Sequence, residues 1–112
     1  MIPDAGEFLA GLRADYMVSV RERLAVMRAL LAEARARPDA PAALHELRRL
    51  VHNLAGSGGT YGFTALSALA VEGEARLEAL LAAASPPAAT QFAQIETLLS
   101  GLAVALEAPA GK

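Results

Sequence analysis

The chain has 112 residues and a formal net charge of −2, a length that suits one small domain with a single core. Hydrophobic residues make up 54% of it and aromatic residues only 4%, and this alanine- and leucine-rich composition favours closely packed helices over a β-sandwich. Because cysteine is absent, disulfides and thiolate metal sites are excluded, and the near-neutral charge gives no general case for nucleic-acid binding. We expect one domain over residues 1–112, with residues 108–112 frayed.

The N-terminus and the longest uncharged stretch both argue against targeting to or through a membrane. A secretory signal has a basic segment followed by an apolar one, whereas this N-terminus carries the acidic residues Asp4 and Glu7. The uncharged stretch, residues 79–95, contains two prolines, a threonine and two glutamines, which indicates a helix end, a turn and a new helix rather than a membrane span. We therefore expect a cytoplasmic protein that does not bind membranes.

Apolar residues that recur at steps of three and four predict four helices. The first covers about residues 4–37, either as one helix or as a short helix and a long one separated near residues 15–19. A turn follows, in which Asp39 is a plausible N-cap and Pro41 fits the opening turn of the second helix. That helix is expected to end at about Thr60.

The third helix is expected over about residues 63–84, with Gly73 on its apolar face, where it would allow a close helix crossing. Ser85 and Pro86 suit the N-cap and N1 positions of the fourth helix. Because short connections make successive helices antiparallel, the predicted fold is all-α, an antiparallel up-down four-helix bundle. A divided first helix would add a short extra N-terminal helix.

His52 lies on the second predicted helix beside unusually small residues. With about 3.6 residues per turn, the positions three, four and seven residues later share its face, and they hold Ala55, Gly56 and Gly59. The opposite side is an apolar stripe formed by Leu47, Leu50, Val51 and Leu54. We therefore expect His52 to point to solvent, with room for a partner.

Gly56 admits two interpretations. A glycine inside a helix costs roughly 1 kcal/mol relative to alanine, so its presence one turn after His52 calls for a compensating reason, such as close approach of another macromolecule. Alternatively, Gly56, Gly58 and Gly59 merely end the helix, and His52 is an ordinary solvated side chain.

The segment around His52 resembles the signature of histidine-containing phosphotransfer (HPt) domains. Residues 52–57 read His-Asn-Leu-Ala-Gly-Ser, followed by Gly62 and Leu66, where the family has His-x-Leu-Lys-Gly-Ser and then a glycine and a leucine at these offsets. The lead-in Arg-Arg-Leu-Val-His is similar to the family's Arg-Arg-Ala-Ala-His. The resemblance covers about residues 44–81 and implies that His52 is a phosphorylated nucleophile.

One position departs from the family pattern. The usual lysine three residues after the histidine is Ala55 here, which removes a cation expected near the phosphoryl group. Arg48 and Arg49, one turn before His52, are candidates to replace it as counter-charge. Together with Gly56 and Gly59, these residues form the predicted docking and phosphate-binding face.

The resemblance also implies partners. They would be a response-regulator receiver domain, a hybrid histidine kinase, or both, and the receiver would supply the Mg²⁺ site and the aspartate. For the chain itself we expect a monomer and a phosphorelay intermediate without cofactor, metal or ATP-binding machinery, since it has no glycine-rich phosphate loop. A helical adaptor that binds a receiver or another partner through the same face, without carrying phosphate, is the alternative. The kinase, the regulator and the direction of phosphate flow stay open.

Rival sites are weaker. His45 begins a His-Glu-Leu-Arg run similar to the dimerisation motif of sensor histidine kinases, but leucine replaces the proline of that motif, so we interpret His45 as an exposed helix residue. His45 and His52 are seven residues apart and do not form a chelating pair. The carboxylates of Glu72, Glu74 and Glu78 are interpreted as a solvated helix face rather than an acid–base site.

Overall fold

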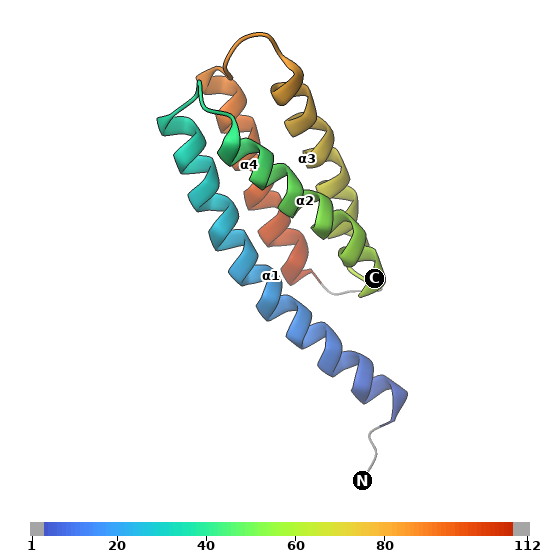
Figure 1. Ribbon diagram of the computed structural model, residues 1–112. Coiled ribbons are helices and arrows are strands. Elements are labelled where there is room, and N and C mark those ends of the chain that lie inside the picture. Colours follow the sequence, from blue (N-terminus) through green and yellow to red (C-terminus); the bar gives the residue numbers. More distant parts are fainter. Residues whose placement is uncertain (1–3, 109–112) are drawn as a thin grey trace.

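The computed structural model describes residues 4–108, which form four α-helices joined by short connections (Figure 1). They are α1 (Ala5–Ala36), α2 (Ala42–Thr60), α3 (Thr64–Ala82) and α4 (Ala89–Glu107). Consecutive helices run in opposite directions, and α1 and α3 each pack against both α2 and α4. The predicted all-α, up-down four-helix bundle is therefore confirmed.

Helix α1 is continuous, so there is no separate short N-terminal helix in the described chain. Asp4 caps it by accepting a hydrogen bond from the Glu7 backbone N–H at 2.7 Å. No glycine or proline interrupts residues 15–19, and both Tyr16 and Val20 are buried in the bundle, which explains why the helix does not break there. The first turns of α1 project beyond the other helices (Figure 1).

Two predicted N-caps are wrong, and proline explains both. Pro41, not Asp39, occupies the N-cap position of α2, because the residue before a proline is disfavoured in the helical region and Ala40 precedes Pro41. The same restriction acts on Pro86, which precedes Pro87, so α4 begins three residues later than Pro86. Its start is instead held by the Gln91 side-chain oxygen, which accepts from the Ala88 N–H at 2.7 Å.

The core runs the length of the bundle and is built from aliphatic side chains with a few aromatic ones. Gly73 of α3 faces α4, and a Cβ placed on it would lie 2.5 Å from Leu98 Cδ2, which confirms the predicted close crossing. On α2 the buried positions include Leu47, Val51 and Leu54, each fully enclosed, so the opposite side of this helix is left to solvent.

Two expectations concern the ends of the chain and its hydropathy. None of the helices within residues 4–108 combines the length and apolar character that a membrane crossing needs. The predicted fraying of residues 108–112 falls, apart from Ala108 at the end of α4, outside the described residues.

Candidate functional site

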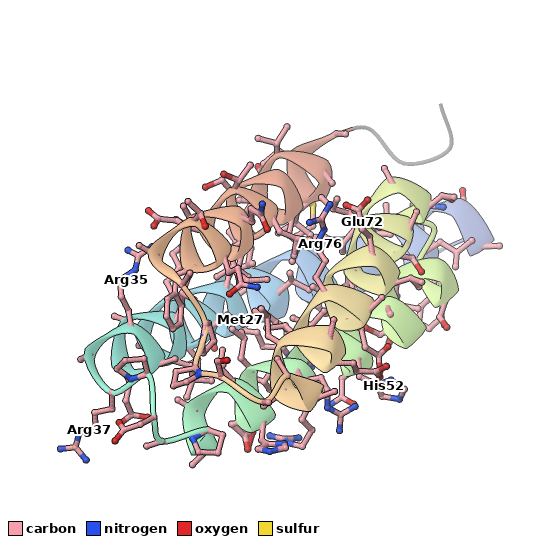
Figure 2. All side chains as sticks on the ribbon, turned by 90° about the horizontal axis from the view of Figure 1, so that it is seen from above. Met27, Arg35, Arg37, His52, Glu72 and Arg76 are labelled. Carbon is pink, nitrogen blue, oxygen red and sulfur yellow. The ribbon has the colours of Figure 1, made fainter. Side chains whose placement is uncertain are left out.

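His52 lies midway along α2 on the solvent-facing side of the bundle, where Figure 2 shows its ring at the outer surface. Its side chain is 64% exposed, as the helical spacing predicted. Because Val51 and Leu54 are anchored in the core on the other side of α2, the rotation of the helix that presents His52 is fixed.

Glu74 of α3 holds one nitrogen of the imidazole. Its Oε2 lies 2.7 Å from Nδ1 of His52. A carboxylate can only accept, so Nδ1 is the protonated donor, and in a neutral ring this leaves the lone pair on Nε2. The Glu74 side chain is only 19% exposed, so the prediction of a solvated carboxylate face is wrong at this position.

Both candidate arginines have carboxylate partners. Nη1 of Arg48 lies 3.6 Å from Oε2 of Glu74 and 3.6 Å from Oε1 of Glu78, across the α2–α3 interface. Arg49 instead donates from Nε to Glu46 at 2.7 Å, within α2, and this hydrogen bond holds the pKa of the Glu46 carboxyl below its usual value. Arg48 is therefore joined to His52 through Glu74, and we call His52, Glu74, Arg48 and Glu78 the His52 cluster. Arg49 is instead paired one turn earlier on the same helix.

The small residues beside His52 differ in what surrounds them. Gly56 is exposed, and a Cβ placed on it would meet nothing within 4 Å. Gly59 is also exposed, with Ser67 Oγ 3.7 Å from its Cβ position. Ala55 is half-buried against the core, and its carbonyl accepts from Ser67 Oγ at 2.6 Å. Packing among residues 4–108 therefore gives no reason for a glycine at position 56.

The glycines do not simply end the helix, because α2 continues through Gly56, Gly58 and Gly59. Gly58 is buried at the crossing with α3, where its Cβ position would lie 3.2 Å from the Ser67 backbone nitrogen. The glycine that ends α2 is Gly62, whose φ of +85° lies in the region that glycine tolerates best.

The motif serine is turned toward α1 rather than toward the imidazole. Ser57 Oγ lies 2.7 Å from the Tyr16 hydroxyl, and the Tyr16 ring stacks on Tyr61 with centroids 4.5 Å apart. Arg13 donates from Nε to the Tyr61 carbonyl at 3.1 Å. Burial raises the pKa of the Tyr16 hydroxyl, so the hydroxyl stays protonated. These contacts fix the C-terminal end of α2 to α1.

The remaining candidates do not converge on His52. His45 is exposed near the start of α2. Within residues 4–108 no three histidine, aspartate or glutamate side chains are arranged to hold a metal ion. The residue that sequence reasoning did not place at this site is Glu74, which the pairing of α2 with α3 brings to the imidazole.

Comparison with known protein families matches residues 11–105 to the Hpt domain. The matched range covers most of the chain, which therefore belongs to the Hpt domain family. Hpt domains are helical bundles that act as histidine phosphotransfer modules in phosphorelays, and they interact with response-regulator receivers and kinases. No curated protein and no solved structure gives a significant match to the chain.

Proposed function

We propose that this domain accepts a phosphoryl group on Nε2 of His52 from a receiver-domain aspartate and passes it to, or takes it back from, another such aspartate. The observation that carries this proposal is the 2.7 Å contact between Nδ1 of His52 and Glu74. It directs the protonated nitrogen into the protein and leaves the nucleophilic nitrogen on an exposed edge of the ring.

The transfer step needs no general acid or base besides His52, Glu74 and the receiver aspartate. The Nε2 lone pair attacks the phosphorus in line, the P–N bond forms as the P–O bond to the aspartate breaks, and the aspartate leaves as a carboxylate. The proton on Nδ1 stays in place. The phosphorylated ring gains positive character, which the Glu74 carboxylate offsets through the same hydrogen bond. In reverse transfer, the neutral ring is the leaving group.

Docking would use the exposed strip of α2 that His52 shares with Gly56 and Gly59. The absence of side chains at these two positions allows a partner surface to approach the helix backbone beside the imidazole. Charge neutralisation during transfer would come largely from the receiver, through its Mg²⁺ and its own basic groups, because Arg48 and Arg49 are both paired with carboxylates. One copy of this chain suffices for the step.

Incubation of the purified domain with a phosphorylated receiver tests this function. Wild type and His45→Gln should acquire acid-labile phosphate, whereas His52→Gln should acquire none while keeping its helical content. Labelling that survives in His52→Gln and disappears in His45→Gln would overturn the site assignment. Receiver binding without any transfer would favour the adaptor alternative.

A further inference from the structure

Arg48 lies between two carboxylates of α3, a position that the predicted counter-charge role does not explain. Glu74 and Glu78 lie one turn apart on α3, and Nη1 of Arg48 is 3.6 Å from an oxygen of each. The Glu74 oxygen that faces Arg48 is Oε2, the same atom that accepts from His52. Arg48 and His52 are four residues apart on α2, so one carboxylate oxygen joins two neighbouring side chains of that helix.

The exposed fractions of the side chains show that Arg48 interacts more strongly with Glu74 than with Glu78. Glu74 is 19% exposed and Arg48 36% exposed, so this pair is less screened by solvent than the rim contact with Glu78, which is 56% exposed. A half-buried carboxylate that faces a neutral imidazole lacks a compensating cation unless Arg48 supplies it. Removal of Arg48 would allow Glu74 to turn toward water and release Nδ1.

We propose that Arg48 is a positioning residue for phosphotransfer that acts through Glu74: it holds the carboxylate on Nδ1 of His52 and so keeps the lone pair on Nε2. This inference rests on the proposed function. It differs from a direct counter-charge role, in which the guanidinium would leave the glutamates and pair with the phosphoryl oxygens. In the positioning role Arg48 acts before the phosphoryl group arrives.

The two roles are separated by a double-mutant cycle with Arg48→Ala, Glu74→Ala and the combined variant. Arg48→Ala should slow transfer by about fivefold, the size of one modest coupling between neighbouring side chains. In the Glu74→Ala background the same substitution should change nothing further, because its target is absent. A further slowing in that background would overturn the proposal in favour of a direct contact with the phosphoryl group.

Nitrogen-15 NMR of the unphosphorylated ring provides a readout that does not depend on transfer. At a pH where the ring is neutral, wild-type His52 should carry its proton on Nδ1, and Arg48→Ala should shift the population toward protonated Nε2, with Arg48→Lys partly restoring it. Arg21→Ala is the control, because it removes an interhelix ion pair between α1 and α4 in which neither His52 nor Glu74 takes part. An unchanged tautomer in Arg48→Ala would refute the proposal. Absence of labelling in wild type would instead refute the proposed function.

Discussion

Oε2 of Glu74 lies 2.7 Å from Nδ1 of His52 and joins two helices through residues 22 positions apart in the chain. The contact makes the two ring nitrogens inequivalent, since one is engaged by the protein and the other faces solvent. This inequivalence determines which nitrogen is available to a phosphoryl donor, and the first prediction follows from it.

Replacement of Glu74 by alanine should slow phosphotransfer by roughly tenfold, the lower end of the loss found when the orienting partner of a metal-binding histidine is removed. The reason is that the ring then distributes its proton over both nitrogens and rotates freely. Quenched time courses of phosphotransfer from a phosphorylated receiver measure this rate. Glu72→Ala, on the same helix but outside the His52 cluster, should transfer at the wild-type rate. Equal rates for wild type and Glu74→Ala would show that the ring needs no orienting carboxylate.

Gly56→Leu should weaken receiver binding and transfer while the bundle gains stability. The new side chain has open space around it in the free domain, and a leucine in a helix is favoured over glycine by up to about 1 kcal/mol. It would, however, stand beside the imidazole and block close approach. Thermal unfolding and receiver affinity measure the two effects separately.

Gly11→Leu provides the control for this substitution. Gly11 also lies within a helix, with nothing within 4 Å of its Cβ position, but on the projecting part of α1. It should gain similar stability and keep wild-type affinity. Undiminished transfer in a well-folded Gly56→Leu protein would reject a docking role for this glycine.

Gly58→Leu should destabilise the domain, in contrast to the same change two residues earlier. Its Cβ position lies 3.2 Å from the backbone nitrogen of Ser67 and 3.3 Å from its Cα, and backbone atoms cannot move aside cheaply. Overpacking of this kind lowers the free energy of unfolding by about 1–3 kcal/mol. It would push α2 away from α3 and break the hydrogen bond from Ser67 Oγ to the Ala55 carbonyl. Chemical denaturation measures the loss. A Gly58→Leu protein as stable as wild type would mean that the crossing is looser than the structure shows.

Introduction of the family's lysine by Ala55→Lys should prolong the life of phosphohistidine. The half-buried position lets the methylene chain lie along the core while the ammonium reaches solvent near His52. The gain should shrink as salt rises, because the added charge is exposed. Decay of the phosphorylated domain at two ionic strengths is the measurement, and identical lifetimes for both proteins would show that the partner alone stabilises the phosphoryl charge.

The position of His52 could be predicted from the sequence because it depends on contacts within one helix. The spacing of Leu47, Val51 and Leu54 determines which side of α2 is buried, and the histidine necessarily falls on the other. The close packing at Gly73 followed in the same way from its place on an apolar stripe.

Glu74 could not be predicted in this way. Its contact with His52 depends on the relative register of α2 and α3, which the Gly58–Ser67 crossing sets in three dimensions. The same crossing distinguishes Gly58, which is needed for packing, from Gly56, which is not. The differences at the helix starts have a local cause, because each proline disfavours the helical region for the residue before it, here Ala40 and Pro86.

The most direct test of phosphotransfer through Nε2 of His52 is to locate the phosphoryl group by phosphorus–nitrogen coupling in the domain labelled with nitrogen-15 histidine. After transfer from a phosphorylated receiver, the proposed mechanism predicts a single phosphorylated ring, that of His52, with the coupling on Nε2 and the proton retained on Nδ1. Phosphorus bonded to Nδ1 of His52, or to either nitrogen of His45, would contradict it.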